Sequence, residues 1–168
     1  SGLSLSSGTL SATGSTSYSN IKYTDGALVT SSLGAITDTL LIPANTFTGN
    51  CSFYVQLNAV KTGSATVNSA GRIYVNTTPD ISGSYTLAAM ASQSNGGYFE
   101  LSRTINVKGS STIFVNSSSN SLNGNGQTNS GTFTSVPIDW TVNQYIIFVV
   151  YGAAAEPAKS VGCIVRKN

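Results

Sequence analysis

Apolar and polar residues alternate along several short stretches of the chain, most clearly over residues 51–61. The apolar positions of this stretch share one face, and these are Cys51, Phe53, Val55, Leu57 and Ala59. The polar positions share the opposite face, and these are Ser52, Tyr54, Gln56 and Asn58. A period of two is the pattern of a β-strand with one face on a core and the other toward water. We therefore predict a long, half-buried strand here.

Further strands are indicated by apolar runs that end at Gly, Pro or Asn turn signals. The predicted strands cover residues 27–30, 34–42, 72–76, 98–107, 112–115, 145–151 and 161–165. Residues 85–91 fit either a strand or a single helical turn, and we favour the strand. About eight or nine short strands with regular turn signals predict an all-β fold, an antiparallel β-sandwich that is jelly-roll-like.

Two segments lack the apolar residues that a core requires. Residues 1–24 are rich in Ser, Gly and Thr, and we predict a linker or an N-terminal strand region. Residues 116–135 contain Leu122 and Phe133 but almost no other apolar residue, which predicts a long exposed loop. The remaining length suits one domain, so we assign residues 25–168 to a single β-sandwich domain.

The predicted strand 145–151 has no polar face, although one face of each strand in a small sandwich should meet water. We place its odd-numbered residues in the core. The even-numbered residues then need a second cover, and these are Ile146, Phe148 and Val150. The loop 116–135 could fold over them but offers few apolar partners. We therefore predict a subunit interface at these three residues in a homo-oligomer.

Arg103 falls in the apolar register of the predicted strand 98–107. A buried guanidinium is costly unless it is paired. Two explanations are open. Either a β-bulge shifts the register and turns Arg103 toward water, or Arg103 is paired and faces a subunit interface.

The two cysteines, Cys51 and Cys163, both lie on the apolar register of their strands. Free cysteines often behave as small buried hydrophobic residues, and we favour that interpretation. A disulfide between two strands is the alternative. Two cysteines in a chain of this length do not make a disulfide scaffold.

Composition narrows the classes of partner. Hydrophobic residues make up 40% of the 168 residues and charged residues only 8%, with a net charge of +2. No basic cluster is present, so we do not expect a nucleic-acid partner. The longest apolar run, residues 145–155, is shorter than the roughly 20 residues of a membrane-spanning helix, so we expect no membrane insertion.

Side chains that carry reaction chemistry are few. The chain has no histidine, which removes Ser-His-Asp and Cys-His catalysis and ordinary zinc sites. The carboxylates form no D-x-D or E-x-x-E pair, and these are Asp25, Asp38, Asp80, Glu100, Asp139 and Glu156. We therefore expect no enzyme activity, no metal site and no cofactor.

Four segments, in order along the chain, resemble motifs of bacteriophage virion domains such as tail fibres, head fibres and spikes. Residues 42–47 read Ile-Pro-Ala-Asn-Thr-Phe and precede Gly-Asn at 49–50, which is similar to an IPANT(L/F)xxG(D/N) motif. Residues 72–76 (Arg-Ile-Tyr-Val-Asn) resemble an R-I-Y-I-N strand, and Arg103 lies where an Arg-x-Ile strand is expected. Residues 138–145 (Ile-Asp-Trp-Thr-Val-Asn-Gln-Tyr) resemble an I-D-W-T-x-x-x-Y-I segment.

The match spans about residues 24–166, with Asn50 where an Asp is usual and a looser match around residues 153–157. The resemblance implies a jelly-roll-like domain on the exterior of a virion, often homotrimeric, with a structural or receptor-binding role and without catalysis. Its partners would be other virion proteins and a host cell-surface glycan or protein. Two other functions stay open: a purely structural head fibre or capsid decoration protein, and a cellular lectin-like adhesin module.

A surface that is low in charge and rich in Ser, Thr, Asn and Gly can bind glycans through hydroxyls, amides and aromatic faces. Three aromatic residues are candidate glycan contacts, and these are Tyr85, Tyr98 and Trp140. Burial in the core is the alternative role for each, and it is the commoner one for such residues.

Overall fold

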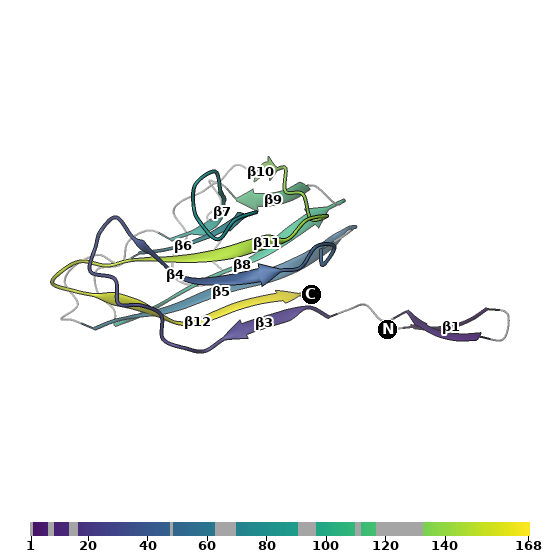
Figure 1. The fold of residues 1–168 in the computed structure, drawn as a ribbon, viewed down its shortest axis with the longest axis horizontal. Coiled ribbons are helices and arrows are strands. Elements are labelled where there is room, and N and C mark those ends of the chain that lie inside the picture. The colour runs from purple at the N-terminus through teal and green to yellow at the C-terminus, as the bar shows by residue number, and fades with distance from the viewer. Residues whose placement is uncertain are drawn as a thin grey trace.

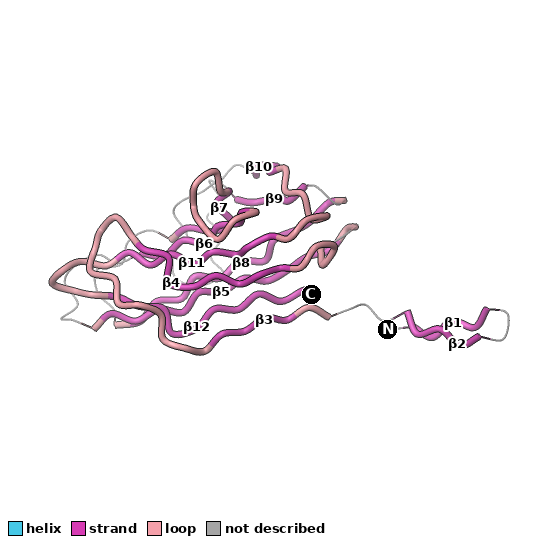
Figure 2. The backbone as a smooth tube through the Cα atoms, viewed as in Figure 1, coloured by secondary structure: helices cyan, strands magenta, loops and turns pink. Residues whose placement is uncertain are grey.

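The structure is a computed structural model of the chain, and it describes residues 2–6, 9–13, 17–47, 49–62, 70–90, 97–109, 112–116 and 133–168. Within these ranges the chain forms strands and no helix, so no helix there could cross a membrane (Figure 2). The strands are β1 (Gly2–Ser6), β2 (Thr9–Thr13), β3 (Ser19–Lys22), β4 (Ala35–Ile42), β5 (Cys51–Lys61), β6 (Ala70–Asn76), β7 (Tyr85–Ala89), β8 (Tyr98–Lys108), β9 (Thr112–Asn116), β10 (Phe133–Val136), β11 (Gln144–Tyr151) and β12 (Ala158–Lys167).

Two antiparallel sheets pack face to face and form a sandwich (Figure 1). One sheet has six strands in the order β10-β9-β8-β5-β12-β3, and the other has four in the order β4-β11-β6-β7. The chain crosses to the other sheet between β3 and β4, β4 and β5, β5 and β6, β7 and β8, β10 and β11, and β11 and β12. Apart from the β9–β10 hairpin, this is the connectivity of an eight-stranded jelly roll. The predicted all-β antiparallel sandwich is confirmed.

The first part of the chain forms strands that belong to two different sheets. β1 and β2 pair only with each other, as a separate two-stranded sheet. β3 lies within residues 1–24, for which a linker or an N-terminal strand region was predicted, and it pairs with β12 at the edge of the six-stranded sheet. The predicted strand 27–30 forms only a bridge between Val29 and Ala158. β10 occupies the end of the predicted loop, and residues 117–132 lie outside the described residues.

The core fills the space between the two sheets. In β5 the predicted alternation is confirmed, because its inward residues are fully buried while the residues between them are partly exposed. Each fully buried large apolar side chain contributes about 1.5–3 kcal/mol relative to exposure. The fully buried residues of β5 are Phe53, Val55, Leu57 and Ala59.

The predicted faces of β11 are reversed in the structure. Ile146, Phe148 and Val150 are fully buried in the core between the sheets. A side chain without exposed surface cannot contact another subunit, so the interface predicted at these residues is wrong. Both faces of β11 are apolar, and alternation alone therefore could not decide which face points inward.

The outer face of β11 is covered by the chain itself. Ile147 and Val149 are buried there although they point away from the main core. Three tyrosines pack around them, and these are Tyr74, Tyr145 and Tyr151. These rings supply the second cover that an apolar strand needs.

Arg103 is buried within the chain. The β5–β8 register runs without a shift through the Val55–Arg103 pair, so no bulge turns the side chain outward. Arg103 shares the inward positions of Leu101 and Ile105, and only 8% of it is exposed. One hydrogen bond of 2.8 Å runs from its Nη1 to the carbonyl oxygen of Ser102. Burial lowers the pKa of the guanidinium. Neither the bulge nor the subunit interface is therefore correct.

The two cysteines are free and far apart. Cys163 pairs with Leu57 of β5, and Cys51 starts the same strand. At about 3.3 Å per residue the separation is roughly 20 Å, well beyond the reach of a disulfide. Burial is confirmed for Cys163, which is fully buried. The same prediction is wrong for Cys51, which is only partly buried at the edge of the core.

Candidate functional site

The turn after β4 docks on the segment before β11. The backbone N–H of Asn45 donates a hydrogen bond of 2.7 Å to the carbonyl oxygen of Trp140. The neighbouring N–H of Ala44 donates to the side-chain oxygen of Asn143 at 2.9 Å. Asn45 has a φ of 62°, in the left-handed region that Asn and Gly tolerate best. These hydrogen bonds join residues 42–47 to residues 138–145, the first and the last of the four segments singled out in the sequence. The two segments thus form one hydrogen-bonded unit.

Aromatic rings hold the same unit together. The Phe47 ring stacks on Phe53 with ring centres 4.4 Å apart and meets the Trp140 ring edge-on at 5.1 Å. Pairs in such geometries are worth about 0.5–1.5 kcal/mol beyond their buried area. Only 1% of Trp140 is exposed. Trp140 is a core residue, and the prediction that it contacts a glycan is wrong.

A small open pocket lies next to this unit, with a volume of about 160 Å³. Hydrogen bonds from Thr141 hold the pKa of the Asp139 carboxyl below its usual value, so the carboxylate is ionised at neutral pH. Ligand pockets usually enclose roughly 300–1,000 Å³, so this one suits only a small group. Its lining includes Val75, Tyr85, Ile138, Asp139 and Gln144.

The outer face of the six-stranded sheet carries a connected row of tyrosine and amide side chains. Tyr54 Oη donates to Gln56 Oε1 at 2.9 Å, and Gln56 Nε2 donates to Asn58 Oδ1 at 2.9 Å. From β8, Tyr98 Oη donates to the same oxygen of Asn58 at 2.8 Å. The three β5 residues share a face because side chains alternate along a strand. The row therefore follows β5 and crosses to β8 at Asn58.

Tyr23 extends this row on the side of β12. Gly162 pairs with Asn58 in the register of β12 and β5. A Cβ at Gly162 would lie 3.2 Å from Cδ1 of Tyr23 and 3.3 Å from Nδ2 of Asn58. The glycine thus leaves the space in which the ring and the amide meet. We call five residues the tyrosine–amide face, and these are Tyr23, Tyr54, Gln56, Asn58 and Tyr98.

The charges around the tyrosine–amide face are few and of both signs. The guanidinium carbon of Arg166 lies 4.8 Å from the centre of the Tyr54 ring. Burial, together with the nearby charge of Glu100, raises the pKa of Tyr98. The Tyr98 hydroxyl is therefore protonated at neutral pH and can act as a donor.

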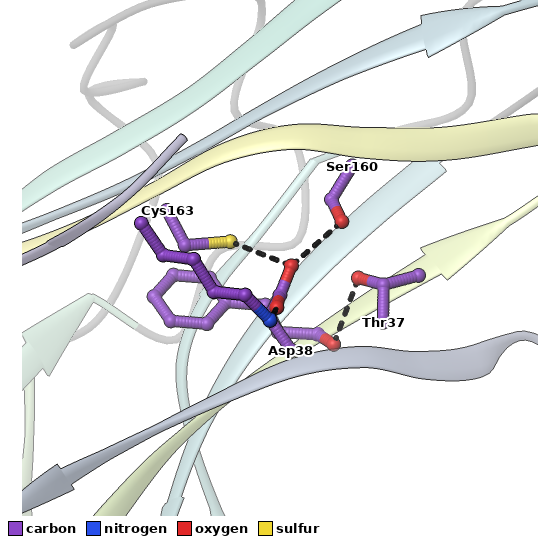
Figure 3. Close-up of polar contacts among 6 residues, drawn as sticks. Thr37, Asp38, Ser160 and Cys163 are labelled. Atoms are coloured by element: carbon purple, nitrogen blue, oxygen red, sulfur yellow. Dashed lines mark hydrogen bonds and ion pairs between the residues drawn. The ribbon is translucent and has the colours of Figure 1, made fainter. Parts of the chain in front are cut away.

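A buried polar cluster joins the edges of the two sheets (Figure 3). Asp38 of β4 forms an ion pair with Lys22 of β3. Its other carboxylate oxygen accepts a hydrogen bond from Ser160 Oγ at 2.8 Å and one from Cys163 Sγ at 3.5 Å, both on β12. Burial, and the negative charge of Asp38, raise the pKa of the Cys163 thiol far above its usual value. The thiol stays protonated, so the cluster does not supply an activated nucleophile.

A second buried carboxylate is also paired with a lysine. Lys61 Nζ lies 3.5 Å from Glu156 Oε2, and both side chains are buried. The buried carboxylates Asp38 and Glu156 are thus each paired with an ammonium group. Among the described residues, no group of three His, Cys, Asp or Glu side chains could hold a metal ion.

The structure separates the three aromatic residues predicted to contact a glycan. Tyr98 lies on the tyrosine–amide face, Tyr85 lines the small pocket, and Trp140 lies in the core. The prediction missed Tyr23 and the polar side of β5. The signal for the latter was present, because the alternation over residues 51–61 places Tyr54, Gln56 and Asn58 toward water.

No protein-family model and no curated protein sequence matches the chain. Among solved structures, the chain is similar to a chain in a structure of infectious bursal disease virus, Gx strain. The TM-score is 0.33 and the sequence identity 11%, and the match covers 99% of this chain and 45% of that chain. The present chain therefore spans less than half the length of the chain it matches. A similarity at this level identifies neither a family nor a function.

Proposed function

We propose that the chain is a non-enzymatic structural protein of a bacteriophage virion, carried on the exterior of the particle as a fibre or spike domain that attaches to the host surface. The observation that carries this proposal is the docking of residues 42–47 on residues 138–145. Both segments resemble virion motifs. Their packing into one unit supports a shared architectural origin over chance matches at two separate places.

The fold is compatible with this role. Jelly rolls occur in viral capsid proteins and in lectins, which are structural and binding proteins. A fold alone does not fix a function. The proposal therefore relies on the packing of residues 42–47 against residues 138–145 and on the exposed tyrosine–amide face. The absence of catalysis is part of the proposal, and it is supported by a histidine-free chain whose buried carboxylates pair with lysines.

Two measurements on particles test the proposal. Immunogold labelling with antibodies to the purified chain should decorate the outside of intact virions and show whether the label lies on the head or the tail. Pre-incubation of host cells with excess purified chain should reduce virion adsorption, whereas an unrelated β-sandwich of similar size should not. Labelling without competition would favour a purely structural head fibre or decoration protein. Absence of the chain from the particles would refute the virion role and favour a cellular adhesin.

We also propose a homotrimer, on the resemblance to virion fibre domains. The interface must lie outside Ile146, Phe148, Val150 and Arg103, because these residues are buried within one subunit. Light scattering at micromolar concentration should give three times the chain mass of 17.3 kDa. A stable monomer would contradict this assembly.

A further inference from the structure

We propose that the tyrosine–amide face is a binding site for neutral oligosaccharides. This inference rests on the proposed attachment function and names the ligand class for it. The site lies on the outer face of the six-stranded sheet and comprises Tyr23, Tyr54, Gln56, Asn58 and Tyr98.

Two exposed rings flank a central amide on this face. Tyr23 is 70% exposed and Tyr98 is 51% exposed, and both lie beside Asn58. The C–H face of a sugar ring is apolar and slightly positive, so it stacks on the electron-rich face of an aromatic ring. Exposed tyrosines with an amide between them offer stacking and hydrogen bonding to the same ligand.

Hydrogen bonds fix the polar groups before any ligand arrives. Gln56 accepts from Tyr54 and donates to Asn58, and Asn58 accepts from Tyr98 as well. The Tyr54 ring lies beneath the Arg166 guanidinium. Ordering a free side chain on binding costs about 0.5–1.5 kcal/mol, and pre-ordered side chains avoid most of that cost. Hydroxyl-rich ligands match such a row because each hydroxyl both donates and accepts.

Charge and length narrow the ligand further. The ionised groups described near this face are of both signs. Arg166 stacks on Tyr54 and Glu100 lies near Tyr98, while Lys159, in the row of Val60 and Tyr98, is ion-paired with Asp25. The charges therefore give no preference for phosphate or uronate polymers. Side chains two residues apart along a strand are about 6.6 Å apart, so Tyr54 to Asn58 spans roughly 13 Å. This length fits an oligosaccharide better than a single sugar ring.

A protein receptor is the competing class of partner. Protein interfaces are usually built around an apolar core with a polar rim. The centre of this face is instead the amide pair of Gln56 and Asn58. The observations therefore favour a carbohydrate.

Affinity electrophoresis of the full chain tests the site, with dextran, mannan or galactan in the gel and polygalacturonate as the anionic comparison. At least one neutral polymer should retard the wild-type chain. Tyr98→Ala and Asn58→Ala should each raise the apparent dissociation constant for that polymer about tenfold. This is the change expected for the loss of one stacking or hydrogen-bonding group. Asn106→Ala is the matched control, because Asn106 is exposed on the same strand but lies toward its other end. Circular dichroism and urea midpoints should show that every variant is folded.

The results separate this inference from the proposed function. No retardation by the three neutral polymers, retardation by polygalacturonate alone, or equal retardation of the Tyr98→Ala chain would overturn the carbohydrate site.

The adsorption assay gives the second readout. If Tyr98→Ala competes with virions as well as the wild type does, or if protease but not periodate treatment of the cells abolishes competition, attachment stands and the glycan site is wrong. If the wild-type chain is retarded but never competes, the sugar site stands and host attachment is wrong.

Discussion

The backbone N–H of Asn45 lies 2.7 Å from the carbonyl oxygen of Trp140, and this hydrogen bond closes one end of the sandwich. Asn45 makes this bond in the left-handed conformation, with a φ of 62°. Asn45→Ala should therefore lower the free energy of unfolding by about 1 kcal/mol, because a Cβ without a polar side chain disfavours this conformation. Asn45→Gly, which adopts it freely, should cost less. Urea denaturation of both variants checks this order, and a fully stable Asn45→Ala protein would contradict it.

The core position of Phe148 gives a second prediction. Phe148→Ala should lower the free energy of unfolding by about 3–5 kcal/mol, since it leaves a cavity between the two sheets. Leu33→Ala is the control, because Leu33 is almost fully exposed and should change stability little. Denaturant midpoints at two protein concentrations distinguish this role from a subunit contact. A Phe148→Ala protein of unchanged stability but altered oligomeric state would show that the core assignment is wrong.

The strand pattern of the fold could be predicted from the sequence, but the facing of every strand could not. In β5 one face is apolar and the other polar, so alternation alone identifies the buried side. In β11 both faces are apolar, and the inward face depends on the neighbouring strands. The cover over Ile147 includes Tyr74, which comes from β6 and is remote in sequence. Local periodicity contains no information about such a contact.

The candidate site was predictable only in part for the same reason. The polar side of β5 could be predicted from its alternation. The place of Tyr23 beside Asn58 depends on Gly162, so it requires three segments to meet. Trp140 illustrates the converse case, because composition cannot distinguish a sugar-stacking ring from one packed on Phe47.

The ion pair of Lys22 and Asp38 should respond unequally to removal of either partner. The Lys22 side chain is 42% exposed and that of Asp38 only 1%. Lys22→Met leaves a buried carboxylate without its counter-charge and should cost about 3–5 kcal/mol. Asp38→Asn leaves an ammonium group that can turn to water and keeps an acceptor for Ser160, so it should cost less, about 1–2 kcal/mol. The double variant should recover part of the Lys22→Met loss in urea denaturation. Equal costs for both single variants would rule out this asymmetry.

The two thiols should react at different rates in the native, reduced protein. Burial raises the pKa of both thiols, but Cys163 is fully buried and also faces the Asp38 carboxylate. Cys51 is partly exposed, and the charge of Lys167 counteracts part of its shift. A thiol reagent at mildly alkaline pH should therefore label Cys51 first and Cys163 only on unfolding. Cys51→Ala and Cys163→Ala assign the two phases, and fast labelling of the Cys51→Ala protein would contradict the burial of Cys163.

Tyr151 should make the protein sensitive to alkaline pH. Its ring lies 5.2 Å from the guanidinium carbon of Arg72, and its hydroxyl lies 3.3 Å from that of Tyr74. Burial, and next the hydrogen bond with Tyr74, raise the pKa of Tyr151 from 10.0 to about 12. The folded protein therefore holds this proton more tightly than the unfolded chain does. The resulting stabilisation is fully present below pH 10 and is lost as the pH rises toward about 12.

Tyr151→Phe removes this titration while keeping the ring over Val149. The variant should be somewhat less stable than the wild type at neutral pH, because it loses the hydroxyl contact with Tyr74. Between pH 10 and about 12 its stability should fall less steeply than that of the wild type. Urea midpoints across this range measure both slopes. Parallel losses of stability would mean that the proton of Tyr151 is held no more tightly in the folded protein than in the unfolded chain.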